Sequence, residues 1–250
     1  MLEILASVLF LLLYLAFLRP RRVGTMVLNG MRIEYPRNMD ERLLRNFAPL
    51  AEWQDKITRG LLAEGAVVHG VSVRDAYLFG PRIGFLLMDV CAHMHGVALP
   101  GAVLLRGTSV AVLLWYRLAN EVHVVLVRQP RVATGRATWE VPAGMADGNG
   151  TLRGQMFTEI EEETGLTLNV HDLQAVDAAP YTSCGLLDET LQLYTMQIPP
   201  NTLTATPEDK PRGNAAEGEL ITNVCAVPLS DPRTLEDGKL RILLSAMTTV

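Results

Sequence analysis

The chain has 250 residues, of which 49% are hydrophobic and 20% are charged, so most of it has the composition of a globular protein. Its 22 basic and 27 acidic side chains give a net charge of -5, which lacks the basic surplus of a nucleic-acid-binding protein. The three cysteines are scattered and odd in number, which is typical of reduced thiols and not of a disulfide framework. We therefore expect a globular protein with no nucleic-acid partner.

The first 18 residues differ in composition from the rest of the chain, because they are apolar except for Glu3. Eighteen helical residues rise about 27 Å, close to the thickness of a hydrocarbon core. Basic residues follow this run at Arg19, Arg21 and Arg22, whereas a signal peptide carries them in front. Residues 1–18 therefore predict a single transmembrane helix with the lipid bilayer as partner. The positive-inside rule then places the bulk of the chain on the matrix or cytoplasmic side.

The next part of the chain changes character twice. Residues 19–40 are basic and interrupted by proline and glycine, which is typical of a juxtamembrane linker. Residues 39–65 have apolar side chains at helical spacing and predict a helix that stops at Gly65. Residues 70–101 predict short strands broken by glycine and proline. We group residues 41–105 as an N-terminal lobe.

Within that lobe, Cys91, His93 and His95 alternate and therefore share one face of a strand. A zinc site would need a fourth ligand. Alternation in a strand also produces such triplets by chance, and chance is the interpretation we favour.

Residues 106–250 form the second predicted domain, in which strand-like and helix-like runs are mixed. Residues 109–118 and 121–130 are β-rich runs that predict a hairpin. A long segment, residues 199–219, has the length of loops that are usually functional or disordered. The other expected elements are strands at 137–144, 189–198 and 220–229, an acidic helix at 151–164 and a last helix at 231–247. This order predicts an α/β (α+β) fold with a mixed sheet between helices.

The acidic helix concentrates like charge behind a glycine-rich loop. Its apolar stripe includes Met156 and Ile160, and Gly165 stands just past its end. Glu159 and Glu163 are four residues apart, so their carboxylates point the same way and repel each other. A divalent cation with oxygen ligands, Mg²⁺ or Mn²⁺, would remove this conflict. A solvated acidic helix is the competing interpretation, because most glutamate runs are of that kind.

The stretch from Gly144 to Leu166 resembles the Nudix box of nucleoside-diphosphate hydrolases. The positions that match the box are Gly144, Glu159, Ile160, Glu162, Glu163, Gly165 and Leu166. Two positions depart from it: Gly150 stands where the family has a glutamate, and Thr158 where it has an arginine. In the family these two side chains tend to pair and to steady the metal-binding glutamates. Loss of such support often lowers metal affinity or activity by roughly 10–100-fold.

From about residue 40 to the C-terminus, the chain is similar to plant-type ADP-sugar diphosphatases and the related ADP-ribose diphosphatases. The resemblance is carried by stretches such as "DAYLFGPRIGFL", "VLVRQPRVATGRATWEVPAGM" and "YTSCGLLDE". It implies a metal site made by the carbonyl of Ala143 and by the carboxylates of Glu159, Glu163 and Glu219. It also implies that Glu217 is the base that activates water, and we group Glu162 with Glu217 as a catalytic candidate. Read without the resemblance, Glu217 and Glu219 are ordinary loop acids.

The same resemblance implies a substrate site formed by Arg131, Trp139 and Glu140. A guanidinium group suits phosphate because it binds two oxygens at once. Each residue also has an ordinary interpretation, since Arg131 fits a surface arginine and a strand tryptophan is more often core.

Two functions follow from these patterns. The departures at Gly150 and Thr158, together with the membrane segment, favour a Nudix-fold accessory or scaffold subunit of a larger membrane complex. We place such a complex in the mitochondrial inner membrane, with other membrane-protein subunits as partners. The alternative is an active Mg²⁺-dependent hydrolase that splits ADP-sugars or ADP-ribose into AMP and a sugar phosphate. Homodimerisation through the N-terminal lobe is left open.

Overall fold

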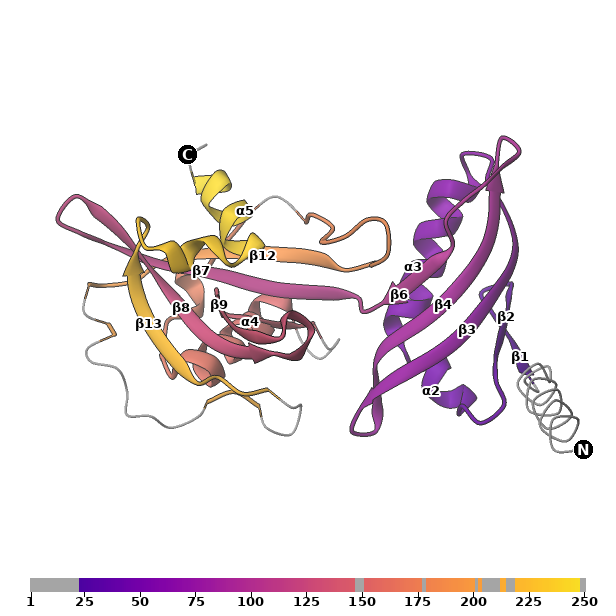
Figure 1. The fold of residues 1–250 in the computed structure, drawn as a ribbon, viewed down its shortest axis with the longest axis horizontal. Helices are drawn as coiled ribbons and strands as arrows, with labels where there is room; N and C mark the ends of the chain where they lie inside the picture. Colours follow the sequence, from indigo (N-terminus) through magenta and orange to yellow (C-terminus); the bar gives the residue numbers. More distant parts are fainter. Residues whose placement is uncertain are drawn as a thin grey trace, which may run out of the picture. The chain divides into compact units, whose positions relative to one another are not determined.

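The computed structural model describes residues 23–146, 151–176, 179–200, 202–203, 212–214 and 219–247. The predicted membrane segment, residues 1–18, lies outside these residues, and so do Gly150 and Glu217. Among the residues that are described, none of the helices combines the length and the apolar character needed to cross a membrane. The chain divides into two compact units, each drawn in Figure 1. The first takes in the described residues of Met1–Leu78 and Arg82–Leu104, and the second those of Phe79–Pro81 and Leu105–Val250.

The first unit is built on a six-stranded sheet with the order β1-β2-β3-β4-β5, in which β6 also pairs with β4. The strands β1 and β2 are antiparallel, whereas β2 and β3 are parallel. The long strands β3 and β4 have 13 residues each, so the prediction of short broken strands over 70–101 is wrong. The bounds are β1 (Val23–Leu28), β2 (Met31–Pro36), β3 (Val67–Phe79), β4 (Arg82–Met94), β5 (Val97–Ala98) and β6 (Ala102–Leu105).

The prediction of a linker over residues 19–40 is also wrong for the described part, because β1 and β2 form a hairpin there. Asn29 and Gly30, both with positive φ, make the two-residue turn that suits the twist of a hairpin. The hairpin is held in the first unit by apolar burial, since Met26 and Ile33 are 3% and 0% exposed.

Two short helices lie against one face of this sheet (Figure 1). They are α2 (Glu41–Arg45) and α3 (Ala48–Ile57), and a π-helical turn, η1 (Thr58–Leu62), continues α3. A single helix over 39–65 was predicted, but the chain breaks between the two helices and restarts with Pro49 in the first turn of α3. Leu44, Leu50 and Trp53 are buried and form the helical side of the core.

The second unit contains a seven-stranded mixed sheet with the order β11-β12-β7-β8-β13, in which β10 pairs with β7 and β9 pairs with β8. The pairing of β12 with β7 is parallel, and the other pairings are antiparallel. The predicted hairpin of residues 109–130 is confirmed as β7 and β8. The bounds are β7 (Thr108–Leu118), β8 (Glu121–Arg131), β9 (Arg136–Glu140), β10 (Ala143–Met145), β11 (Gln174–Ala175), β12 (Thr190–Gln197) and β13 (Asn223–Pro228).

Helices cover both faces of this second sheet (Figure 1). On one face, α4 (Leu152–Glu159) and a π-helical turn, η3 (Ile160–Thr164), pack on a core that includes Val112. On the other face, α5 (Gly238–Met247) packs on a core that includes Leu113. Successive residues of β7 point to opposite faces, which is why a continuous apolar run serves both cores. The α+β architecture of a mixed sheet between helices agrees with the sequence prediction. Among its described residues, the unit also has short 3₁₀ turns: η2 (Val132–Thr134), η4 (Val170–Asp172) and η6 (Pro232–Leu235).

Candidate functional site

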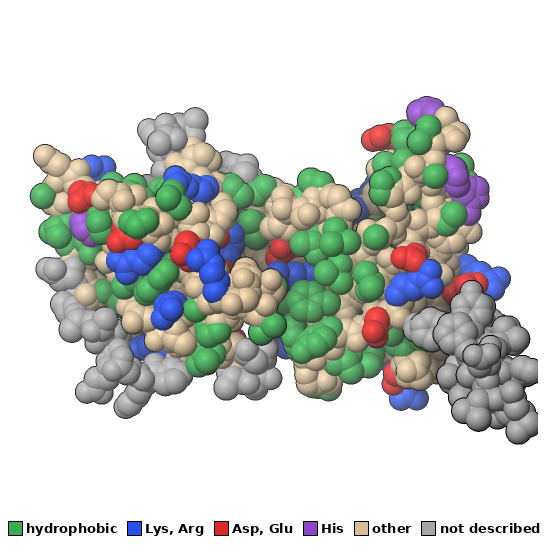
Figure 2. Space-filling view, viewed as in Figure 1, with side chains coloured by type: hydrophobic (Ala, Val, Ile, Leu, Met, Phe, Trp, Pro, Cys, Tyr) green, Lys and Arg blue, Asp and Glu red, His purple; other side chains and the backbone are tan. Residues whose placement is uncertain are grey.

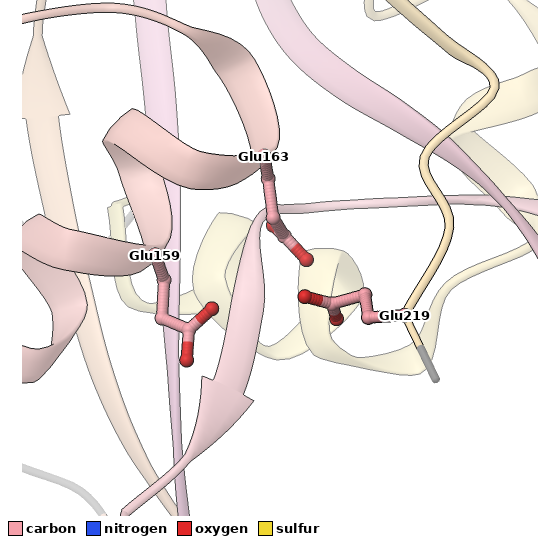
Figure 3. Close-up of side chains that lie close together, drawn as sticks. All are labelled: Glu159, Glu163 and Glu219. Atoms are coloured by element: carbon pink, nitrogen blue, oxygen red, sulfur yellow. The ribbon is translucent and has the colours of Figure 1, made fainter. Parts of the chain in front are cut away.

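Three carboxylates converge at the end of α4. Glu159 is the last residue of α4, Glu163 lies in η3, and Glu219 lies in the chain that leads to β13. One oxygen atom from each of the three side chains lies within 4.8 Å of the other two. Figure 3 shows the side chains pointing into a shared space from the helix and from the late segment. We call Glu159, Glu163 and Glu219 the glutamate cluster.

The backbone of β10 fixes where two of these carboxylates lie. Gly144 faces the Glu159 carboxylate so closely that a Cβ atom at Gly144 would lie 1.8 Å from Glu159 Oε1. Any residue other than glycine would therefore displace Glu159. The backbone N–H of Ala143 donates to Glu163 Oε2 at 3.1 Å. The role of the Ala143 carbonyl as a metal ligand stays a prediction.

The helix that carries Glu159 and Glu163 is capped at both ends. Thr151 accepts a hydrogen bond from the N–H of Gly154 at the start, at 3.1 Å. The last turn widens into a π-helical turn, a feature that is frequent at functional sites. Gly165 ends it with φ at +70°, and a Cβ atom there would lie 1.7 Å from Arg212 Nη1. A side chain at position 165 would meet both strain and a clash.

Glu163 is the most buried member of the cluster, with 1% of its surface exposed. Burial raises the pKa of Glu163 well above its usual value, and the negative charges of Glu219 and Glu159 raise it further. The opposing effects of the Ala143 N–H and of Lys239 are smaller. A divalent cation would relieve the repulsion among the carboxylates, and a set of carboxylate oxygens is the donor type that Mg²⁺ and Mn²⁺ prefer.

Gln129, a residue that the sequence did not single out, holds the third carboxylate. It lies on β8, is 5% exposed, and its Nε2 donates to Glu219 Oε1 at 3.2 Å. The other oxygen of Glu219 accepts the backbone N–H of Asn214 at 3.4 Å. Glu219 is thus oriented by one strand residue and by its own loop.

A second group of charged residues lies close by on β8, β9 and α5. Arg131 donates from Nε and Nη2 to the two oxygens of Glu140, at 2.8 and 3.0 Å. Thr138 Oγ1 and Lys239 Nζ also donate to Glu140, at 2.7 and 2.9 Å. Burial alone would raise the pKa of Glu140, but the cations Arg131 and Lys239 outweigh it and bring the pKa to about 2. We call Arg131, Glu140 and Lys239 the ion-pair network.

Arg131 also lies within electrostatic reach of the glutamate cluster. Burial alone would lower the pKa of Arg131, whereas Glu140, and beyond it Glu163 and Glu219, raise it. The predicted substrate residues Arg131 and Glu140 therefore lie together, within electrostatic reach of the predicted metal ligands Glu163 and Glu219.

The other predicted residues are not members of the glutamate cluster. Trp139 packs at the edge of the core beneath α5, with the guanidinium of Arg233 5.1 Å from its ring centre. Glu162 is exposed, and its carbonyl accepts the N–H of Gly213 at 3.2 Å. The exposed Thr158 Oγ1 bonds to the Gly154 carbonyl of its own helix, so it does not take over the contacts of an arginine.

The alternating Cys91, His93 and His95 do not gather into a metal site. Over the described part of the chain, the glutamate cluster is the one group of three or more acidic, histidine or cysteine side chains at ligand distance. Histidines do gather on the first unit (Figure 2), where the rings of His69 and His93 meet edge to face with centres 5.1 Å apart. Such a pair is a packing contact.

Comparisons with known proteins bear on the family and the fold of this chain. No family model matches the chain. Nudix hydrolase 14, chloroplastic, of Arabidopsis thaliana is 33% identical over 197 residues, which cover 73% of this chain and 62% of that protein. The chain thus spans less than two thirds of the length of this relative. A crystal structure described as an ADP compounds hydrolase is similar in fold, with a TM-score of 0.50 and 18% identity over 74% of this chain and 91% of that one.

The mixed sheet between helices, with a glutamate-rich helix following a glycine-containing strand, is the arrangement that the resemblance to the Nudix box predicts. The chain belongs to the Nudix superfamily, as the sequence resemblance predicted. Neither match supports the prediction of an accessory subunit in a membrane complex.

Proposed function

We propose that the chain is a Mg²⁺-dependent hydrolase that splits an ADP-sugar or ADP-ribose into AMP and a sugar phosphate. The observation that carries this proposal is the convergence of Glu159, Glu163 and Glu219, with Glu163 almost fully buried. A buried, ionised carboxylate beside two others is unfavourable unless a cation balances the charge, and a raised pKa is the metal-free response to this repulsion. The relative described as a Nudix hydrolase and the similar fold described as an ADP compounds hydrolase point to the same class.

The residues of the site would have different roles in such a reaction. Glu159, Glu163 and Glu219 would hold the cation, with Gln129 orienting Glu219. When bound, Mg²⁺ would stabilise the negative charge that develops on the diphosphate. Arg131 carries the guanidinium that suits a phosphate of the substrate.

The bond changes follow from the chemistry of diphosphate hydrolysis. Water attacks one phosphorus, the bond from that phosphorus to the bridging oxygen breaks, and the bridging oxygen leaves with the other phosphate. A carboxylate base takes the proton of the attacking water. We assign this role to Glu217, which lies two residues before Glu219 in the sequence but outside the described residues.

The test is a hydrolysis assay on the purified full-length chain. ADP-ribose and ADP-glucose are incubated with millimolar Mg²⁺ or with EDTA, and AMP is quantified by chromatography. We expect AMP to form with Mg²⁺ and not with EDTA. The Glu163→Gln variant should form AMP at least roughly 100-fold more slowly than the wild type. Glu161→Gln is the matched control, because Glu161 is an exposed neighbour on the same turn and is not a member of the cluster. No AMP from either substrate, or equal rates for the two variants, would refute the proposal.

A further inference from the structure

Lys239 occupies a position that helix stability alone does not explain. It is the second residue of α5, and its backbone N–H donates to Asp237 Oδ1 at 2.9 Å, the geometry of a helix N-cap. The start of a helix carries partial positive charge, so a lysine there is electrostatically unfavourable. Its side chain is also only 20% exposed, and burial of a lysine costs free energy unless the charge is paired.

The attachment of α5 to the sheet does not rest on Lys239 alone. Asp237 Oδ2 accepts the N–H of Val141 at 2.9 Å, and Glu236 Oε2 accepts the N–H of Trp139 at 2.9 Å. These two contacts tie the start of α5 to the end of β9 and the residue after it. The ammonium group of Lys239 instead reaches Glu140 Oε2 at 2.9 Å and Asp237 Oδ1 at 3.4 Å.

Lys239 therefore acts on the carboxylate that holds Arg131. Each oxygen of Glu140 has two donors, one from Arg131 and one from a different residue: Thr138 on Oε1 and Lys239 on Oε2. With both outside donors in place, the carboxylate cannot rotate or follow Arg131. The positive charge of Lys239 also balances the negative charge of Glu140, so the ion-pair network carries a net charge of about +1. Arg131 therefore keeps its attraction for an anion.

We propose that Lys239 is a positioning residue, which holds Glu140 in place so that Glu140 presents the Arg131 guanidinium to a phosphate of the substrate. This inference rests on the proposed function, because it assumes an ADP compound at the site. It assigns to α5, on the opposite face of the sheet from α4, a part in substrate binding.

The experiment measures ADP-ribose binding to the full-length chain by calorimetry in EDTA, where no metal-dependent turnover occurs. We expect Lys239→Met to weaken binding by about 10-fold, the effect of losing one hydrogen bond to a charged group. Lys239→Arg should restore affinity to within about 3-fold of the wild type, because it returns a cation to Glu140. Lys56→Met is the matched control, since Lys56 is an exposed lysine of α3 in the first unit.

A double-mutant cycle shows whether Lys239 acts through Arg131. In an Arg131→Ala background, Lys239→Met should cause no further loss of ADP-ribose binding. Mg²⁺ affinity, measured separately, should stay within about 3-fold of the wild type in Lys239→Met, which a general loss of structure would not allow. In steady-state assays the KM should rise more than the kcat falls, as expected for lost binding. Lys239→Gln, which keeps a polar group at the site, replaces Lys239→Met if the latter does not fold.

The outcomes separate this inference from the proposed function. The role of Lys239 would be overturned if Lys239→Met binds ADP-ribose as the wild type does, or if the losses in the cycle are additive. It would also be overturned if Lys239→Met loses Mg²⁺ and ADP-ribose affinity equally and Lys239→Arg does not restore them. If the wild type neither binds nor hydrolyses an ADP compound, the proposed function itself fails.

Discussion

The glutamate cluster and the ion-pair network lie in the same unit, but their charges are balanced in opposite ways. In the cluster, Glu159, Glu163 and Glu219 bring three like charges within 4.8 Å. In the network, Glu140 has four hydrogen-bond donors, three of which come from cations. The pKa of Glu163 is raised and that of Glu140 is lowered, although both carboxylates are largely buried.

The difference in charge balance separates two roles, cation binding in the cluster and orientation of Arg131 in the network. The network is complete with the protein's own side chains, so it can stabilise the fold and orient Arg131 without a ligand. The cluster is incomplete on its own: once Glu163 is ionised, its three negative charges need a cation to balance them. Removal of one carboxylate should therefore destabilise the fold in the network and stabilise the metal-free fold in the cluster.

The largest expected effect on stability is at Glu140. Glu140→Gln should destabilise the protein by about 3 kcal/mol at pH 7, because Arg131 and Lys239 lose a buried counter-charge. The folded-state pKa of Glu140, about 2, lies below the usual 4.5, so its stabilisation is present above pH 4.5 and is lost as the pH falls towards 2.

Urea unfolding at pH 7 and at pH 3 measures this effect. The wild type should approach the variant in stability at the lower pH. Glu121→Gln, at the exposed start of β8, is the control and should behave as the wild type at both values. If Glu140→Gln is as stable as the wild type at pH 7, the ion-pair network does not stabilise the fold.

Gly144→Ala should break the cluster without removing a charge. The added Cβ would lie 1.8 Å from Glu159 Oε1, so Glu159 must move. We expect Mg²⁺ affinity to fall by roughly 10–100-fold, the range seen when ligand orientation is lost. Calorimetry with MgCl₂ measures the change. Gly185→Ala is the matched control, since a Cβ there meets open space, and equal affinities for the two variants would show that the steric role of Gly144 is wrong.

Glu163→Gln should change stability in the opposite direction from Glu140→Gln. The pKa of Glu163 is raised in the folded state, so the folded protein binds this proton more tightly and loses stability as the pH rises above 4.5. In EDTA at pH 8 the variant should therefore be more stable than the wild type, by about 1 kcal/mol, with no such gain at pH 4. Thermal unfolding in EDTA at pH 8 and at pH 4 measures the difference in stability at each pH. Added Mg²⁺ should stabilise the wild type and not the variant. A variant that is less stable than the wild type in EDTA at pH 8 would show that repulsion among the three carboxylates does not destabilise the metal-free fold.

The smallest effect is expected at Gln129. Gln129→Met should weaken Mg²⁺ binding by about 3-fold, because Glu219 loses the donor on Oε1 but keeps the N–H of Asn214. Calorimetric titration resolves a change of this size. A Gln129→Met variant with wild-type Mg²⁺ affinity would show that the loop alone orients Glu219.

Much of the second unit follows from the sequence because its signals are local. The period of the apolar residues predicts the β7–β8 hairpin and the acidic helix, and helical spacing alone brings Glu159 and Glu163 together. Glu219 is different, since it lies 56 residues after Glu163 and no spacing connects them. It was found through the resemblance alone.

Other features needed contacts that a sequence does not display. The roles of Gln129 and Lys239 depend on partners in other parts of the chain, Glu219 and Glu140. The sequence alone therefore does not distinguish either residue from an ordinary polar residue. The linker prediction overlooked a signal that was present, because Asn29–Gly30 is a strong hairpin dipeptide. The single helix over 39–65 similarly ignored Pro49, which fits the first turn of a helix and not its middle.

If the glutamate cluster holds one divalent cation, Mn²⁺ titration of the full-length chain, followed by electron paramagnetic resonance, should detect it. The wild type should bind one equivalent of Mn²⁺ at this site, in competition with Mg²⁺. The triple variant Glu159→Gln, Glu163→Gln and Glu219→Gln should lose that binding while remaining folded. Equal Mn²⁺ binding by the wild type and a folded triple variant, or no binding by the wild type, would show that the cluster does not hold a divalent cation.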